Sequence, residues 1–231
     1  MTAGTVTAMS ASEVHSITES VFFTTPASLP RGRHTLDRAD IVAAHRERIM
    51  IAMTELMAAH GFDAVTIAEI ASRAAVSRAA FYAVFDDKEA CALAAYERFI
   101  TVLLGSVGAA LSRPAPFAEV LGDVITAYLT TLESDPVVGR AFQVEMDAVG
   151  YHARQWRRDS LDLFARALAE RHQAEVPRRP KALPDSAYLG GVYAIRQIAS
   201  DALDTEQRPK LAALAPELTR WLSNIYASPE R

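Results

Sequence analysis

Two helix N-cap signals lie close together in this chain, and they constrain its local fold more than any other feature. Thr66 and Glu69 have the T-x-x-E spacing of a capping box, in which the hydroxyl accepts a hydrogen bond from the third helical amide. The carboxylate in turn accepts one from the Thr amide, so the box predicts a short helix that runs to about Arg73. Ser77 is a second N-cap and predicts another short helix, over residues 78–84. Only a few residues of turn separate the two helices.

A longer helix is expected before these two. Its apolar residues recur at i, i+3, i+4, i+7 and i+8, which gives one apolar stripe made of Ile49, Ala52, Met53, Leu56 and Met57. We expect this helix to begin within residues 37–40 and to end at Gly61. After the short helices, Asp87 caps a long helix that begins at Lys88. Two short helices joined by a turn and braced by a longer first helix are the outline of a helix-turn-helix unit.

Beyond Lys88 the chain is predicted to be helical to its end, with breaks at proline and glycine. The predicted helices span residues 88–111, 117–134, 137–148, 151–175, 186–204 and 208–228. No segment has a persuasive alternation of apolar and polar residues, so the predicted fold class is all-α. We expect an N-terminal three-helix helix-turn-helix domain with a basic arm, residues 31–87, and a C-terminal helical domain, residues 88–231.

Residues 1–30 are predicted to be a disordered leader, because they hold eleven Ser or Thr residues and show no amphipathic period. An ordered strand around Val21-Phe22-Phe23 is the alternative. Arg31 and Arg33 follow this leader and precede the first helix. Short basic arms on helix-turn-helix domains commonly enter the adjacent minor groove, and a solvated linker is the other interpretation of this segment.

A larger pattern runs from Arg46 to Glu89 and includes Gly61, Thr66, Ile70, Ala71, Val76, Ser77, Tyr82, Phe85 and Lys88. In this spacing, over roughly a fifth of the chain, it resembles the DNA-binding domain of the tetracycline-repressor (TetR) family of bacterial transcription regulators. Two positions depart from the family: Ala75 stands at the sharp turn, where the family usually has Gly, and Ala79-Ala80 replaces Gly-Thr. A positive φ at Ala75 would cost about 1 kcal/mol.

The resemblance implies that the second short helix enters the major groove of DNA. Ser77, Ala79 and Ala80 are small residues that let its backbone lie deep in the groove. Arg78 is the long polar side chain there and can pair with O6 and N7 of guanine, with a phosphate contact or a solvated surface position as alternatives. Tyr82 is expected to place its hydroxyl on a phosphate, with buried packing as its alternative.

Further residues are expected to hold the DNA backbone. The positions that match Thr66, Tyr82 and Lys88 resemble backbone clamps in the family. Thr66 and Lys88 lie at predicted helix N-termini, where free amides and the helix dipole favour an anion. Arg46 completes the candidate DNA-binding residues, and the expected partner is double-stranded operator DNA with an inverted repeat.

The C-terminal region resembles the family only in its helical architecture. The last two helices of such proteins usually form a four-helix interface with the second subunit of a homodimer. Candidate interface residues are Tyr188, Tyr193, Leu218, Trp221, Leu222 and Ile225, with an internal core face as the alternative. Gly190-Gly191 in the first of these helices would let helices approach closely.

The middle helices of the family surround a mostly apolar ligand pocket. Candidate lining residues are Phe99, Leu103, Leu121, Val124, Tyr128, Phe142, Met146, Trp156 and Phe164, with ordinary core packing as the alternative for each. The abundance of aromatic side chains favours a flat or greasy effector of unknown identity over a sugar or an ion.

Other functional classes find little support in the sequence. The single cysteine, Cys91, excludes an internal disulfide, and the six histidines form no H-E-x-x-H or i, i+4 metal pair. No phosphate-binding loop and no G-x-S-x-G elbow is present. We therefore expect no enzyme activity, no metal and no cofactor. Cys91 is interpreted as a small core residue, with a redox-sensing thiol as the alternative.

The chain is expected to be cytoplasmic and to bind no membrane, because it shows no secretory signal and no apolar stretch near the roughly 18 residues of a membrane span. Its net charge of −4 means that the fold must direct a few basic groups toward DNA. The predicted function is a homodimeric repressor that a small apolar or aromatic ligand releases from a palindromic operator. A DNA-binding regulator without a small ligand, and an all-α ligand carrier or enzyme, are the alternatives.

Overall fold

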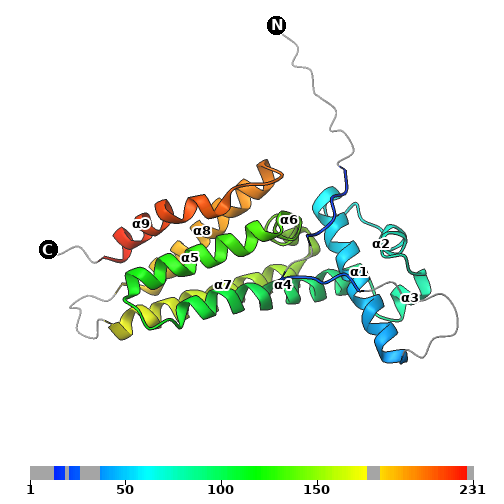
Figure 1. The fold of residues 1–231 in the computed structure, drawn as a ribbon, viewed down its shortest axis with the longest axis horizontal. Helices are drawn as coiled ribbons and strands as arrows, with labels where there is room; N and C mark the ends of the chain where they lie inside the picture. The colour runs from blue at the N-terminus through cyan, green and yellow to red at the C-terminus, as the bar shows by residue number, and fades with distance from the viewer. Residues whose placement is uncertain (1–12, 19–20, 27–36, 176–182, 228–231) are drawn as a thin grey trace, which may run out of the picture.

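Three helices form one end of the molecule: α1 (Arg38–His60), α2 (Ile67–Arg73) and α3 (Arg78–Tyr82) (Figure 1). The computed structural model describes residues 13–18, 21–26, 37–175 and 183–227. Asp37 caps α1, whose other end closes at Gly61 with a φ of 77° and an amide bonded to the Met57 carbonyl. This positive φ is one that glycine adopts without a steric penalty. The predicted first helix is confirmed at both ends.

The remaining helices form an elongated bundle: α4 (Lys88–Leu111), α5 (Phe117–Ser134), α6 (Pro136–Gln143), α7 (Tyr151–Glu175), α8 (Asp185–Thr205) and α9 (Ala215–Tyr226), with two short 3-10 helices, η1 (Glu145–Val149) and η2 (Leu211–Leu214). In Figure 1, α4, α5 and α7 run along the long axis. Helix α8 packs against α7, and α9 packs against α5. The described residues contain no strand, and the predicted all-α fold class is confirmed.

Several predicted boundaries shift. The predicted helix 137–148 is two elements, because α6 ends at Gln143 and η1 follows it. The predicted helix 208–228 is also divided, into η2 and α9. Pro216 lies in the first turn of α9, where a residue without an amide hydrogen is tolerated. The same proline would break a helix that continued from η2 into α9. The second short helix ends at Tyr82, two residues before the predicted end.

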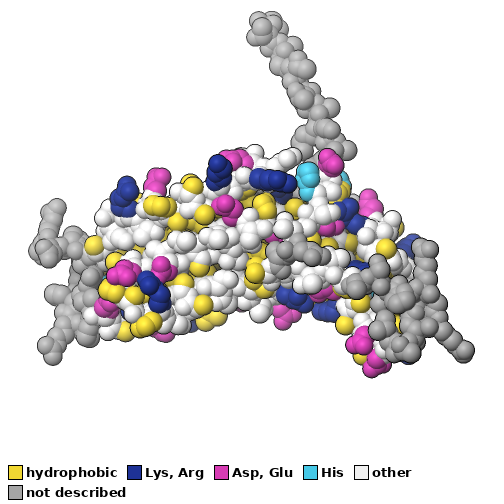
Figure 2. Space-filling model, viewed as in Figure 1, with side chains coloured by type: hydrophobic (Ala, Val, Ile, Leu, Met, Phe, Trp, Pro, Cys, Tyr) yellow, Lys and Arg dark blue, Asp and Glu magenta, His cyan; other side chains and the backbone are white. Residues whose placement is uncertain are grey.

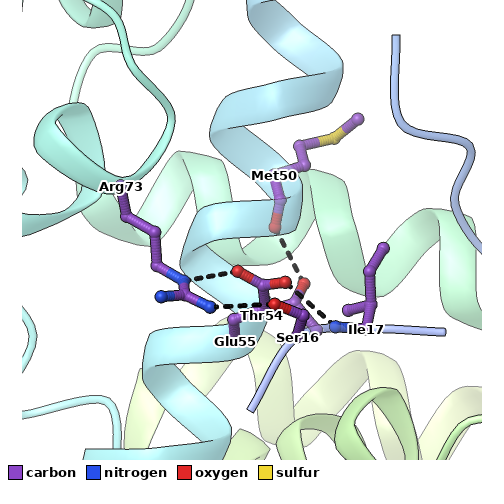
Figure 3. Close-up of polar contacts among 6 residues, drawn as sticks. All are labelled: Ser16, Ile17, Met50, Thr54, Glu55 and Arg73. Carbon is purple, nitrogen blue, oxygen red and sulfur yellow. Dashed lines mark hydrogen bonds and ion pairs between the residues drawn. The ribbon is translucent and has the colours of Figure 1, made fainter. Parts of the chain in front are cut away.

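The N-terminal strap, by which we mean residues 13–18 and 21–26, corrects the expectation of a disordered leader. Phe22 and Phe23 are buried, and the Phe22 ring stacks on Phe99 of α4 with 5.4 Å between centroids. The amide of Ile17 donates to Oε1 of Glu55, a buried carboxylate on α1 (Figure 3). The polar composition of this segment predicted disorder. Burial of two aromatic rings and hydrogen bonds from main-chain amides to carboxylates instead hold the strap against the helices. Residues 1–12, 19–20 and 27–30 of the predicted leader lie outside the described residues.

Helix α4 connects the two ends of the molecule. It packs against α1 at its beginning and against α5 and α7 along its length. By length and composition it could cross a membrane, with a mean hydropathy of 1.4 in its most apolar stretch, contrary to the expectation that no such segment exists. Core helices of soluble proteins meet the same criterion. Here its buried stripe, which includes Cys91, Tyr96, Phe99 and Leu103, contacts other helices of the bundle.

Candidate DNA-binding surface and ligand cavity

The turn between α2 and α3 is a complete Schellman motif with alanine at its left-handed position. Ala75 has a φ of 54°, the only positive value at a described residue other than glycine. The Ala75 amide donates to the Ser72 carbonyl (3.1 Å), and the Val76 amide donates to the Ala71 carbonyl (3.0 Å). Glycine is the usual residue at this position because it has no Cβ. The expected strain at Ala75 is therefore present, and the turn keeps its geometry despite it.

Helix α3 presents one polar face outward. Ser77 caps it by accepting a hydrogen bond from the Ala80 amide (3.0 Å). Phe81 is fully buried and fixes the inner face, whereas Tyr82 is 51% exposed. Arg78 is also exposed, and because it precedes Tyr82 by four positions, the two side chains share the outer face. This is the arrangement that a helix lying in a DNA groove requires.

Two other basic side chains near α3, those of Arg73 and Arg46, contact groups of the protein itself. Arg73 pairs with Glu55 and also bonds the Ser16 hydroxyl (Figure 3). The Arg46 guanidinium lies over the Phe85 ring at 4.6 Å, which leaves its outer edge exposed. Arg78, by contrast, makes no hydrogen bond or ion pair with any described residue. On the face shown in Figure 2, basic and acidic side chains are intermingled. Arg31 and Arg33 lie outside the described residues.

The capping box at the start of α2 is confirmed. The Thr66 hydroxyl accepts from the Glu69 amide (3.3 Å) and donates to Glu69 Oε2 (2.7 Å), and the Thr66 amide donates to the same carboxylate (2.8 Å). These hydrogen bonds lower the pKa of Glu69 below its usual range, and the hydrogen bond from the Thr66 hydroxyl has the largest effect. Thr66 is exposed, so its phosphate contact stays a prediction.

Lys88 has a different role from the one expected. Its ammonium donates to the carbonyls of Phe62 (2.9 Å), Val65 (3.0 Å) and Asp63 (3.3 Å), and it lies 4.4 Å from the centroid of the Phe62 ring. An ammonium has three donors, and these carbonyls engage all of them. This geometry gives Lys88 a structural role, closing the loop between α1 and α2, in place of the expected phosphate clamp.

A cavity opens among α4, α5, α7 and α8, with further lining from α6 and α9. Its empty volume is about 790 Å³, part of it open to solvent. Most of its lining is apolar. Of the expected lining residues, six are present: Leu103, Leu121, Val124, Tyr128, Phe142 and Phe164. Phe99, Met146 and Trp156 do not line it. Phe99 instead stacks on Phe22, and Trp156 packs edge-on against Tyr96, which does line the cavity.

Sequence reasoning missed the polar lining of this cavity. Gln143, Arg157 and Arg196 line it together with Tyr96. The omission arose because candidates were chosen for apolar character. A usable signal existed on α8, where Arg196 follows Val192 by four positions and so interrupts a buried apolar stripe.

The expected dimer residues divide into two groups. Tyr188, Leu218 and Leu222 are buried within the subunit, so the structure contradicts their assignment to a dimer face. Leu222 lines the cavity, and a Cβ at Gly191 would lie 2.8 Å from its side chain. Gly191 therefore permits close approach of α8 and α9 within one subunit. The large apolar residues that remain exposed on these helices are Tyr193, Ile198, Trp221 and Ile225.

Cys91 lies in the core, with its sulfur near the carbonyl of Ile49. Burial raises the pKa of the Cys91 thiol far above its ordinary value, which disfavours the thiolate that redox chemistry requires. This supports the interpretation of Cys91 as a core residue. The described part of the chain holds no group of three His, Cys, Asp or Glu side chains placed to bind a metal.

Comparison with known proteins gives one family and a common fold. Residues 49–95 match the family described as bacterial regulatory proteins, tetR family. No curated protein matches the chain. Among solved structures, the fatty acid degradation regulator FadR from Bacillus halodurans has a TM-score of 0.70 at 16% identity, covering 81% of this chain and 97% of its own.

Two other similar structures contain ligands. FadR from Bacillus subtilis in complex with stearoyl-CoA has a TM-score of 0.67 at 18% identity, covering 79% of this chain and 98% of its own. RolR in complex with resorcinol has a TM-score of 0.52 at 22% identity, covering 84% and 98%. At these identities the likeness establishes the fold.

Proposed function

We propose that the protein is a sequence-specific DNA-binding transcriptional regulator that acts in the cytoplasm as a homodimeric repressor, and the match of residues 49–95 to the tetR family supports this proposal. The observation that carries this proposal is the outer face of α3, where Arg78 and Tyr82 are exposed side by side. We keep residues 31–87 as the proposed DNA-binding domain and residues 88–231 as the proposed effector and dimerisation domain.

The roles of the residues on α3 follow from their chemistry. A guanidinium can donate two hydrogen bonds to O6 and N7 of one guanine, so Arg78 is proposed to read a base. The Tyr82 hydroxyl is proposed to bind a phosphate and so to fix the register of the helix. Ser77, Ala79 and Ala80 admit the backbone to the groove, while Arg46 and Thr66 are proposed as flanking phosphate contacts.

A dimer supplies two copies of α3 related by a two-fold axis. Tyr193 and Ile198 on α8, with Trp221 and Ile225 on α9, are large apolar side chains that keep 38–41% of their surface exposed. We propose that they form the interface. Gly190 lies beside them, and a Cβ placed there would meet no atom within 4 Å, so a partner helix could approach closely. The operator would then be an inverted repeat with half-sites about 34–36 Å apart.

Selection of bound duplexes from a random pool tests this proposal. We expect enrichment of one inverted repeat by the full-length protein. Arg78→Ala should weaken binding to that site by about 1–3 kcal/mol and relax the preference at one base in each half-site. Arg158→Ala, an exposed position on α7, is the matched control. Failure of the folded dimer to enrich any sequence would contradict the proposal, and a uniform loss for Arg78→Ala would make Arg78 a phosphate contact.

Ligand control is proposed to act through α4. This helix begins beside α1 and contributes Tyr96, Leu103 and Val107 to the cavity lining. A ligand between α4 and its neighbours would move the cavity end of α4 and thereby re-orient α3. A differential affinity of about 1–3 kcal/mol for the two arrangements would weaken operator binding about 5–150-fold. The complexes of two similar folds, FadR with stearoyl-CoA and RolR with resorcinol, support the proposal that a protein of this fold binds a small ligand.

Reciprocity provides the test of ligand control. If a ligand weakens operator binding, the operator must weaken ligand binding by the same factor. Trp156 contacts Tyr96 of the lining, so its fluorescence can report occupancy in a Trp221→Phe background. Equal ligand affinity with and without operator would show that the bound compound is not the inducer.

A further inference from the structure

The cavity has one polar end and one apolar end. Arg196 Nη2 donates to the Gln143 carbonyl (2.6 Å), and the Tyr128 hydroxyl donates to Oε1 of the same glutamine (3.3 Å). Arg157 follows Trp156, which packs on Tyr96 with 5.8 Å between ring centroids. The lining residues with polar groups thus gather where α6 ends, and α6 packs against α1 of the proposed DNA-binding domain.

The opposite end is apolar. Val107 of α4 and Val124 of α5 belong to a separate apolar cluster against which Phe164 of α7 packs. Leu121 and Leu222 extend this lining. No charged residue contributes to this end of the lining among the described residues. The cavity is therefore suited to a molecule whose two ends differ in polarity.

Positive charge at the polar end exceeds what the protein neutralises. Arg157 pairs with Asp147 through Nη1, but its Nε is buried and makes no hydrogen bond with any described residue. Arg196 has no carboxylate partner in the described part of the chain. Of the two guanidinium groups only that of Arg157 has a carboxylate partner, and this carboxylate is half exposed. A buried donor without a partner is costly, so the site favours an added anion.

We propose that the effector is an amphiphilic organic anion whose carboxylate binds between Arg157 and Arg196 and whose apolar body extends toward Val107 and Leu222. This inference rests on the proposed ligand control and narrows its ligand class, since a purely apolar molecule would leave the charge at this end unmatched. Guanidinium groups bind carboxylates through paired, charge-assisted hydrogen bonds.

Matched probes of the full-length protein test the headgroup. Dodecanoate and dodecanol have the same chain, and 4-phenylbenzoate carries the carboxylate on an aromatic body. Binding is measured by Trp156 fluorescence and by calorimetry, without DNA and below the concentration at which the probes form micelles. We expect at least one of the two acids to bind, with dodecanol binding at least about 10-fold more weakly than dodecanoate if the aliphatic acid is the ligand class.

Substitutions of the two arginines test whether they bind the carboxylate of the acid. Arg157→Met and Arg196→Met should each weaken binding of the acid about 10–100-fold while leaving dodecanol unchanged. Arg196→Lys, which keeps the charge, should restore part of the affinity. Arg158→Met is the control on the same helix outside the lining. The Ser200 hydroxyl also donates to the Gln143 carbonyl (3.0 Å), so Arg196→Met leaves that acceptor paired and should fold.

Equal affinity for dodecanoate and dodecanol with no binding of 4-phenylbenzoate would overturn the proposal, as would binding of neither acid. Retention of acid binding in both folded methionine variants would also overturn it. Because these measurements contain no DNA, they separate the two proposals. A protein that binds the acid through the arginines but no operator would contradict the proposed function and leave this inference intact.

Discussion

The main-chain amide of Thr18 donates a 2.9 Å hydrogen bond to Asp135, a residue 117 positions away. Asp135 is itself the N-cap of α6 and accepts from the amides of Val137 and Val138, both at 3.2 Å. One buried carboxylate therefore holds both the N-terminal strap and the start of a bundle helix. The strap bonds Glu55 of α1 through the neighbouring amide of Ile17, so it joins α1 to α6.

Removal of a strap aromatic should destabilise the whole protein. Phe22 is fully buried against Phe99, so Phe22→Ala should lower the free energy of unfolding by about 3–5 kcal/mol. Val21 is 63% exposed, and Val21→Ala should change the free energy of unfolding by less than about 0.5 kcal/mol. Urea denaturation monitored by circular dichroism measures both. Equal, small effects of the two substitutions would mean that the strap is not part of the folded core.

Stability should depend on pH through Asp135. Burial raises the pKa of its carboxyl to about 6, against the hydrogen bonds that lower it. An unfolded aspartate releases its proton near pH 4, so between about pH 4 and 6 the folded protein binds the extra proton. The contribution of Asp135 is thus fully present below this window and is lost as the pH rises through it. Asp135→Asn should flatten that fall in denaturation curves, and an unchanged slope would contradict the assignment.

Relief of the strained turn should stabilise the helix-turn-helix unit. Ala75→Gly removes the Cβ from a left-handed residue, at the cost of greater chain entropy in the unfolded state. The relief of strain should exceed this entropic cost, so we expect the free energy of unfolding to rise by up to about 1 kcal/mol. Ala74, the preceding residue, has a φ of −71°, and Ala74→Gly should instead be destabilising by about 1 kcal/mol. A lower thermal midpoint for Ala75→Gly would refute the strain argument.

Lys88→Met should affect folding more than DNA binding. The methionine keeps an apolar stem but leaves the carbonyls of Phe62, Asp63 and Val65 without their donor. We expect the free energy of unfolding to fall by about 1–3 kcal/mol. The salt dependence of operator binding should keep its slope, because no phosphate contact is lost. A slope smaller by about one unit would restore Lys88 as a phosphate clamp.

The proposed dimer should separate when charge is placed on its exposed face. Trp221→Glu combined with Ile225→Glu should give a folded monomer in light scattering, since both side chains are exposed on α9. Thr130→Glu, at an exposed position on α5, is the control and should remain a dimer. Leu222→Glu should unfold the subunit, because Leu222 is buried in it. A dimeric double variant would place the interface elsewhere.

The parts of the fold that depend on neighbouring residues could be predicted from the sequence. The capping box at Thr66 and the cap at Ser77 each involve groups within a few positions, so their residue types determine the local geometry. The sharp turn at Ala75 was expected only from the family resemblance, because alanine itself disfavours a left-handed conformation. The strap was missed for the opposite reason. Its partners at Asp135 and Phe99 are distant in sequence, and no local pattern connects them with Thr18 or Phe22.

The sites were predicted less completely than the fold. On α9 an apolar stripe was recognised, but periodicity alone could not tell that Leu222 faces inward while Trp221 faces solvent. In the cavity, the apolar side chains of Leu103 and Phe164 could be predicted as lining residues, because ligand pockets are mostly apolar. Arg157 and Arg196 were missed because a charged side chain is ordinarily interpreted as surface. Arg196 interrupts the buried stripe of α8, but only the packing of α7 against α8 brings both arginines to one cavity.

The strap also orders events during synthesis on the ribosome. The strap emerges before any of the helices that hold it, whereas Phe99 and Asp135 are translated much later. The nascent chain can close the turns around Ala75 early, whereas its first segment must wait until α6 has left the exit tunnel. A bulky fusion placed ahead of residue 13 would have to be carried through that late docking step, so expression tags for this protein belong at its other terminus.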